Sequence, residues 1–229
     1  LARAKLLLEK HMKNVEIQAV IFDCDGTLVD SETHSLAVLV EHVAEFGLNI
    51  THAEAMERFA GNELSVVFRE FEQRLGHSLP ETFLDEFRHR QMSVLEQNVT
   101  AIDGAHELIG SLSLPFCVAS NAPLNKINLC LTTTGLIPHF HESRIFSAYQ
   151  INAWKPRPDL FLMAAEALGI PPENCAVVED SHFGIDAGLA AGMQVFAFDP
   201  HNKFSAFNDI TRIASLNELQ PVFSAGPAH

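Results

Sequence analysis

The stretch Ile21–Asp30, with the sequence IFDCDGTLVD, joins a buried strand to two acidic residues. The apolar run Ala19–Phe22 has strand length and does not alternate with polar residues, which is typical of a strand buried on both faces of a parallel sheet. Gly26 then permits a sharp turn. A strand of this kind places Asp23 and Asp25 at its carboxyl end, where open α/β sheets bind ligands.

Further apolar runs of strand length follow toward the C-terminus. They are Phe116–Ala119, Ile145–Phe146, Cys175–Val178 and Val195–Phe198. Helical patterns lie between the later runs, at Leu124–Thr134, Asp159–Leu168 and His182–Ala191. Because strands and helices alternate, the sequence predicts an α/β fold with a Rossmann-like parallel sheet.

Residues 32–98 differ from the rest of the chain, because they contain no convincing strand. Apolar residues recur there at helical spacing in three groups, around Leu39, Val67 and Phe87. Gly61 is expected to form a turn between two of the helices. The sequence therefore predicts a small helical domain inserted into a core of residues 12–31 and 99–229. Residues 1–11 end at a His-Met pair that is common at cloning junctions, so we expect them to be vector-derived.

Composition and charge exclude several classes of partner. The 229 residues carry 15 Lys and Arg against 29 Asp and Glu, a net charge of −14, so the surface should repel nucleic-acid backbones. No apolar stretch reaches the roughly 18–20 residues that span a bilayer, so no membrane partner is expected. The four cysteines form no CxxC pair, which favours a cytoplasmic protein with reduced thiols. We expect a monomer or a weak dimer.

Three further motifs carry chemistry, and each lies at a predicted strand end or helix start. The strand that ends in Ser120 offers a hydroxyl group that can hold phosphate oxygens. Pro156 favours an extended backbone at Lys155, and an ammonium group there would keep nearby carboxylates ionised. Glu179 and Asp180 follow another buried strand, and oxygen ligands of this kind suit Mg²⁺.

Each motif has a structural alternative when it is taken alone. An acidic turn, a Ser-Asn turn, a surface lysine and an Asp that caps a helix would each explain one of them. The order of the motifs argues against these separate explanations, because the acid pair, the serine, the lysine and the second acid pair follow one another along the chain. Two carboxylates two residues apart can also divide labour, one as a nucleophile and the other as a proton carrier.

Taken together, the four motifs resemble the haloacid dehalogenase superfamily of aspartyl phosphotransferases, and the resemblance covers about residues 20–198. It implies that Asp23 attacks phosphorus and forms a phospho-aspartyl intermediate. It also implies that Asp25 protonates the leaving oxygen and later activates water. Family members that dehalogenate lack the second acid, so the presence of Asp25 favours phosphoryl chemistry.

The same resemblance implies Mg²⁺ as the cofactor. The metal would be held by Asp23, the carbonyl group of Asp25 and Asp180, with Glu179 as a ligand or behind the ligands. The residues expected to bind the substrate are Ser120, Asn121, Asn125, Lys126 and Lys155. For Asn125 and Lys126, a surface pair at a helix start remains the alternative.

The helical insertion resembles the small cap domain of the β-phosphoglucomutase-like subgroup, which closes over the site and selects the substrate. Mutases of that subgroup commonly carry a Lys-Gly…Arg pattern in the cap, and here Gly61 stands without either cation. This departure favours a phosphatase that acts on small sugar phosphates, with 6-phosphogluconate as a candidate substrate. Two alternatives stay open: a β-phosphoglucomutase and a non-catalytic metabolite-binding protein.

Overall fold

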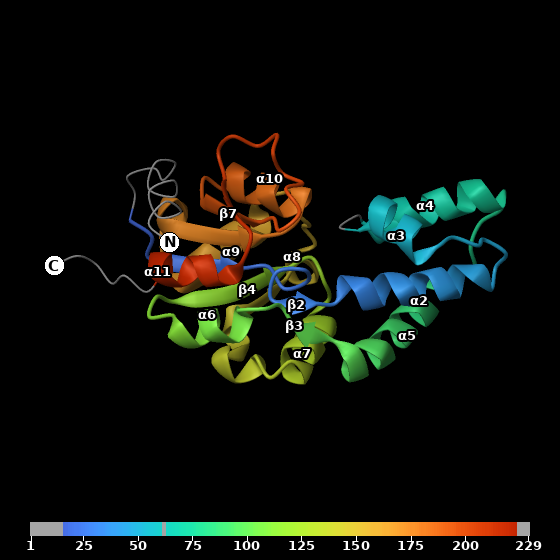
Figure 1. Cartoon of the computed structure of the whole chain (residues 1–229), viewed down its shortest axis with the longest axis horizontal. Helices are drawn as coiled ribbons and strands as arrows, with labels where there is room; N and C mark the ends of the chain where they lie inside the picture. Colours follow the sequence, from blue (N-terminus) through green and yellow to red (C-terminus); the bar gives the residue numbers. More distant parts are fainter. Residues whose placement is uncertain (1–15, 61–62, 224–229) are drawn as a thin grey trace. The chain divides into compact units, whose positions relative to one another are not determined.

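The computed structural model describes residues 16–60 and 63–223, which divide into two compact units. One unit is Asp30–Thr100, and the other consists of the chain on either side of it (Figure 1). The helical domain predicted from the sequence, residues 32–98, falls within Asp30–Thr100. Residues 1–11, expected to be vector-derived, and Gly61, expected to be a turn, lie outside the described residues.

The larger unit is built on a six-stranded sheet with β1 in its interior. In spatial order the strands are β5 (Ile145–Ser147), β4 (Phe116–Ser120), β1 (Ala19–Phe22), β6 (Cys175–Glu179), β7 (Gln194–Phe198) and β8 (Thr211–Ile213). All neighbours in this sheet run parallel. The predicted α/β fold is confirmed. Strand β8 is not among the predicted strands, because this edge strand is only three residues long and contains no apolar run.

Helices cover both faces of this sheet. On one face lie α9 (Asp159–Leu168) and α10 (His182–Ala190), and Phe161 of α9 packs there with Ile21 and Val177. Figure 1 shows α6 (Ala105–Ser111) and α7 (Leu124–Thr133) on the other side of the sheet from α10. There, the ring of Phe196 lies 5.2 Å from that of Phe223 in α11 (Gln220–Phe223). The sheet is therefore buried on both faces, as its unalternated apolar strands predict.

Short elements complete this unit. They are α8 (Ala148–Ile151) and the 3₁₀-helices η1 (Ile137–His139), η2 (Glu142–Arg144), η3 (Pro172–Asn174) and η4 (Leu216–Leu219). The chain passes between the units through β2 (Val29–Asp30) and β3 (Thr100–Ala101), which form a two-stranded sheet. The inserted segment therefore leaves and re-enters the larger unit through two paired strands.

The smaller unit contains four helices within its described residues. They are α2 (Glu32–Ala44), α3 (His52–Phe59), α4 (Leu64–Leu75) and α5 (Phe83–Asn98). Phe71, Phe83 and Phe87 lie at its core and are almost completely buried. The sequence pattern does not single out α3, because this eight-residue helix buries only Ala55 and Phe59.

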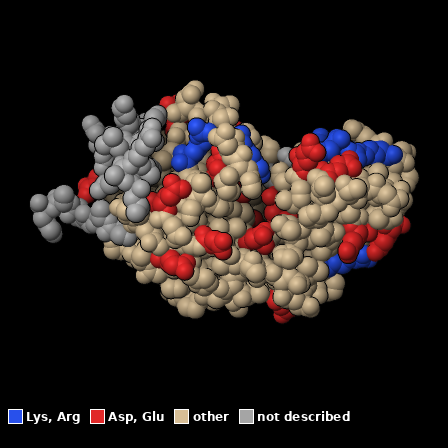
Figure 2. All heavy atoms as spheres, viewed as in Figure 1, with Lys and Arg blue, Asp and Glu red and all other residues tan. Residues whose placement is uncertain are grey.

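Acidic and basic side chains are distributed unequally over the surface. Figure 2 shows carboxylates spread across the face in view, while the Lys and Arg side chains lie in a few groups, one of them over α3 and α4. Among residues 16–60 and 63–223, no helix is both long enough and apolar enough to cross a membrane.

Candidate active site

Asp23 and Asp25 leave the sheet in a tight loop at the carboxyl end of β1. The backbone N–H of Asp23 still donates to the carbonyl of Val178 in β6, at 3.0 Å. Gly26 has a φ of +79°, a conformation that L side chains rarely adopt, and its N–H donates to the carbonyl of Val29 at 2.8 Å. The turn expected at Gly26 is therefore confirmed, and it holds both acidic residues at one end of the sheet.

Lys155 is buried between two carboxylates from neighbouring strands. Its Nζ donates to Oδ1 of Asp23 at 2.5 Å and to Oε1 of Glu179 at 2.7 Å. The ring of Phe161 lies 4.7 Å from the same ammonium, a cation–π distance. Only 5% of Lys155 is exposed, so the alternative of a surface lysine at a helix entrance is wrong.

This burial changes the proton affinities of the cluster. Desolvation raises the pKa of Asp23 to about 7, with Glu179 and Asp25 adding to the rise and Lys155 opposing it. Burial would by itself lower the pKa of Lys155, but Asp23 and Glu179 outweigh it and raise this pKa above its usual range. The cluster therefore keeps its ammonium at neutral pH, while the pKa of Asp23 is moved toward neutrality.

Glu179 is held at both of its oxygens. While Oε1 accepts from Lys155, Oε2 accepts from the backbone N–H groups of Asp180 and Ser181 at 2.9 and 2.8 Å and from the Ser181 hydroxyl at 2.8 Å. Ser181 is also the residue that caps α10, because its Oγ accepts from the N–H of Gly184. This carboxylate is therefore fixed in orientation by the start of the helix that follows it.

The oxygen atoms at this edge fit a hard divalent cation. The Asp180 carboxylate accepts from Thr27 at 2.9 Å, and a side chain at Gly26 would place its Cβ only 2.1 Å from Oδ2 of Asp180. Asp180 therefore lies against the loop that carries Asp23 and Asp25. Within residues 16–60 and 63–223, no three His, Cys, Asp or Glu side chains gather as a metal site. The metal ligands that the family resemblance implies are only two carboxylates and one backbone carbonyl. Together with water molecules, such oxygen ligands suit Mg²⁺.

Ser120 and Asn121 lie at the end of β4, next to the cluster. Ser120 is 2% exposed, and its Oγ accepts from the N–H of Ala122 at 3.1 Å. The side chain of Asn121 bonds to the backbone of Lys155. The serine hydroxyl is thus held at the same edge as Asp23, while Asn121 contacts a neighbouring loop.

Lys126 lies nearer to the acidic residues than the sequence indicates. Its Nζ donates to Oδ1 of Asp25 at 2.7 Å, and only 12% of its side chain is exposed. Burial opposes the charged form, but Asp25 outweighs it and raises the pKa of Lys126. The alternative of a helix-start surface pair therefore fails for Lys126. Asn125 is exposed at the start of α7, and its role stays a prediction.

Two residues that shape this site, Thr27 and Phe161, are not among the predicted site residues. Thr27 anchors Asp180, and the signal was present, since Thr27 belongs to the first motif. Phe161 lies in a helix whose apolar spacing predicts only packing, so no local signal marks its contact with Lys155. The assembled site has a buried carboxylate beside a fixed cation, a second carboxylate on the same loop and a hydroxyl group, which together can support nucleophilic attack and proton transfer.

Comparison with known proteins agrees with this arrangement. The family model for haloacid dehalogenase-like hydrolases matches residues 20–198. The chain is also 36% identical over 212 residues to the 6-phosphogluconate phosphatase of Escherichia coli K12, covering 91% of this chain and 96% of that protein.

Solved structures show the same fold. A haloacid dehalogenase-like protein from Agrobacterium tumefaciens has a TM-score of 0.80 and 33% identity, covering 91% of this chain and 98% of that one. A HAD family hydrolase from Deinococcus radiodurans, solved with bound phosphate and sodium, has a TM-score of 0.67 and 36% identity. That match covers 80% of this chain and 81% of the other.

Proposed function

The chain belongs to the haloacid dehalogenase-like hydrolases, and we propose that it is a Mg²⁺-dependent phosphatase of small sugar phosphates. The observation that carries this proposal is the buried Lys155 ammonium, held by Asp23 and Glu179 next to the loop that bears Asp25. A fixed cation at this place favours the ionised form of the Asp23 carboxylate, against the effect of burial, and attracts the dianionic phosphate. The protein would thereby bind phosphate esters although its net charge is −14.

Two observations support the choice of substrate. The relative from Escherichia coli that matches almost the whole chain is a 6-phosphogluconate phosphatase, and the similar structure from Deinococcus radiodurans holds phosphate. We therefore take 6-phosphogluconate as the first substrate to test, within the wider class of small phosphorylated sugars and sugar acids.

In the first step, a carboxylate oxygen of Asp23 attacks phosphorus and the bond from phosphorus to the ester oxygen breaks. Asp25 gives its proton to that departing oxygen, so the alcohol leaves neutral and Asp23 carries the phosphoryl group. Lys126 contacts Asp25 at 2.7 Å and orients it. Lys155 and Ser120 bind the phosphoryl oxygens on which negative charge increases.

In the second step, Asp25 is ionised and acts as a base. It takes a proton from a water molecule, and the oxygen of that water attacks the phosphorus bound to Asp23. The bond between phosphorus and the Asp23 oxygen breaks, which releases inorganic phosphate and restores both carboxyl groups to their starting states. Glu179 orients Lys155 throughout, because both of its oxygens are already engaged.

Asp23, Asp180 and the carbonyl group of Asp25 are the residues that would hold the metal. When bound, Mg²⁺ would neutralise the repulsion between the Asp23 carboxylate and the phosphate dianion. Thr27 orients Asp180 for this role, through its hydrogen bond to Oδ1.

The test is phosphate release with and without Mg²⁺ over a panel of sugar and sugar-acid phosphates, with Asp23→Asn as the blank. Metal-dependent turnover that concentrates on 6-phosphogluconate is the expected result. Turnover spread evenly over the panel would support the phosphatase chemistry but exclude 6-phosphogluconate as the preferred substrate. Conversion of β-glucose 1-phosphate to glucose 6-phosphate without phosphate release would replace the proposal by a mutase. Metal-dependent binding without any turnover would replace it by a metabolite-binding protein.

A further inference from the structure

The side chain of Asn121 bonds to both backbone polar groups of Lys155. Its Oδ1 accepts from the Lys155 N–H at 2.9 Å, and its Nδ2 donates to the Lys155 carbonyl at 3.4 Å. The two residues are 34 positions apart, so this contact joins the loop after β4 to the loop that precedes α9. One amide group thereby fixes the backbone from which the Lys155 side chain extends.

The loop that carries Asn121 is itself fixed at both sides of Ala122. The N–H of Ala122 donates to Oγ of Ser120 at 3.1 Å, and the carbonyl of Ala122 accepts from the hydroxyl of Ser147 at 2.6 Å. Ser147 is fully buried at the end of β5, and its N–H donates to Gln150 at 2.8 Å. Asn121 is therefore anchored to two strands of the sheet and can act as a rigid support.

The ammonium group of Lys155 also has little freedom to move. Asp23, Glu179 and the ring of Phe161 surround Nζ, and its two hydrogen bonds are short. A shift of the Lys155 backbone by a fraction of an ångström would therefore be transmitted directly to Nζ. Misplacement of a charged group by about 1 Å can lower a catalytic rate about 100-fold.

We propose that Asn121 is a positioning residue, which holds the Lys155 backbone so that its ammonium meets both Asp23 and the phosphoryl group. This proposal rests on the proposed function only in the second of these contacts. It gives Asn121 a role other than the expected contact with substrate, because the amide oxygen and one N–H of its side chain bond to the Lys155 backbone.

The first test is independent of turnover. We expect amide hydrogen exchange at Lys155 to become at least about tenfold faster in Asn121→Leu, because its N–H loses its acceptor. Asn121→Asp keeps an acceptor for this N–H, so it should retain most of the protection. Asn174→Ala is the matched control. Asn174 directly precedes β6, at the opposite end of the sheet, and its side-chain amide donates to the carbonyl of Glu16. Unchanged exchange in folded Asn121→Leu would overturn the proposal.

The second test asks whether Asn121 acts through Lys155. In the wild-type background, Asn121→Leu should lower kcat by roughly 10- to 100-fold with a smaller change in KM, and Asn121→Asp should recover part of the loss. In a Lys155→Ala background, Asn121→Leu should lower kcat by less than about twofold, since the two residues act as one unit. Losses that multiply would mean that Asn121 acts on the substrate or on folding, which overturns the proposal.

The two proposals fail in distinguishable ways. If the wild-type protein releases no phosphate from any substrate, the proposed function fails. The same four-variant cycle is then measured with inorganic phosphate by calorimetry, and non-additive losses of affinity together with the exchange result still support the positioning role. If the wild-type protein turns over substrate and Asn121→Leu matches it both in the exchange rate of the Lys155 amide and in kcat, only the positioning role fails.

Discussion

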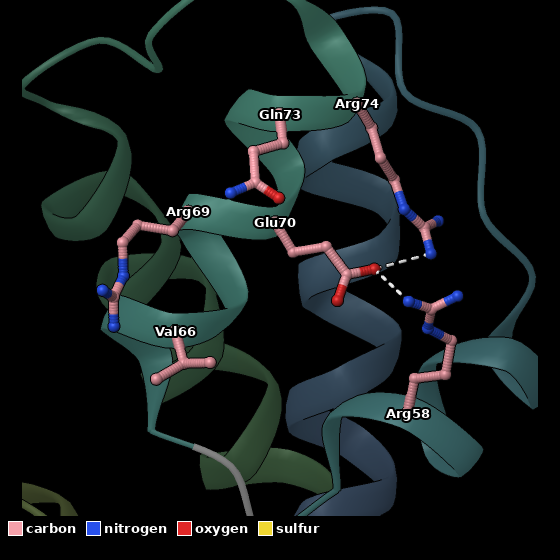
Figure 3. A pocket seen from close by; sticks show the side chains of 6 residues that line it. All are labelled: Arg58, Val66, Arg69, Glu70, Gln73 and Arg74. Atoms are coloured by element: carbon pink, nitrogen blue, oxygen red, sulfur yellow. Dashed lines mark hydrogen bonds and ion pairs between the residues drawn. The ribbon is translucent and has the colours of Figure 1, made fainter.

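Each unit of the molecule contains a network of ion pairs, and the two networks differ in their exposure to water. In the α/β unit, Lys155 pairs with Asp23 and Glu179, and these three side chains are 2%, 9% and 1% exposed. In the helical unit, Arg74 pairs with Glu54 and Glu70, and Arg58 shares Glu70 at 2.6 Å (Figure 3). The side chains of this second network are 25–49% exposed.

The exposed network braces two helices and leaves little charge for other tasks. Glu54 and Glu70 together balance the charges of Arg58 and Arg74, whose guanidinium groups both lie 5.9 Å from the ring of Phe59. Arg58, Glu70 and Arg74 line an open hollow of about 590 Å³ on α3 and α4. Water screens such pairs, so each contributes little to stability.

The buried network behaves differently because water does not screen it. Two carboxylates share one ammonium, which leaves a net negative charge in a region of low dielectric. That charge is compensated in part by the backbone N–H groups that Glu179 accepts from at the start of α10. The same pairing chemistry therefore braces helices where it is exposed, and where it is buried it leaves groups with shifted pKa values.

The largest effect should come from removing the charge of Asp23, the proposed nucleophile. We expect Asp23→Asn to lower turnover at least about 1,000-fold, because a neutral amide cannot attack phosphorus. The measurement is Mg²⁺-dependent phosphate release. Glu54→Gln, in the exposed network, is the control and should stay close to wild-type turnover. Near-normal activity of Asp23→Asn would refute the proposed mechanism and the catalytic role of the buried network.

The next effect should be on stability. Lys155→Met leaves Asp23 and Glu179 buried without their cation, so urea unfolding should show a loss of about 3–5 kcal/mol at pH 8. Burial raises the pKa of Asp23 to about 7, well above its unfolded value, so Asp23 binds a proton as the pH falls and the loss should be smaller at pH 5. Adding Glu179→Gln should recover part of it. A loss below about 1 kcal/mol at pH 8 would show that this network is as weak as a surface pair.

A smaller effect should follow from crowding the buried network. In α10, a Cβ at Gly184 would lie 1.8 Å from Cδ of Glu179, so Gly184→Ala must displace that carboxylate. We expect a loss of about 1–3 kcal/mol in urea unfolding, although alanine favours a helix. Gly110→Ala in α6 is the matched control, because its Cβ would have no neighbour within 4 Å, and it should stabilise by about 0.4–1 kcal/mol. Equal effects of both substitutions would contradict the tight packing around Glu179.

The smallest effect should come from the exposed network. Arg74→Ala breaks two ion pairs, yet it should lower the free energy of unfolding by no more than about 1 kcal/mol. The loss should shrink at about 1 M salt, where the Debye length falls to about 3 Å. Urea unfolding at low and high salt measures both. A loss above about 3 kcal/mol that salt does not change would make the two networks energetically equivalent.

Most elements of the fold could be predicted from local sequence. The strands that begin at Ala19, Phe116 and Cys175 were predicted because each is a continuous apolar run that ends in polar residues. Helix α9 was predicted with both of its bounds, because Gly169 marks its end. The pattern did not reveal α3, α6 or β8, which are only eight, seven and three residues long and bury few apolar residues.

Local sequence patterns suffice to predict which groups lie at the carboxyl edge of the sheet. Ser120 and Glu179 end buried strands and Asp23 directly follows one, and parallel strands bring such ends together. The contacts among these groups depend instead on the tertiary structure. The contacts of Lys155 with Glu179 and of Asn121 with the Lys155 backbone join segments 24 and 34 residues apart. Local patterns cannot encode such pairings, because they depend on the order of the strands and on how each loop folds back over the edge of the sheet.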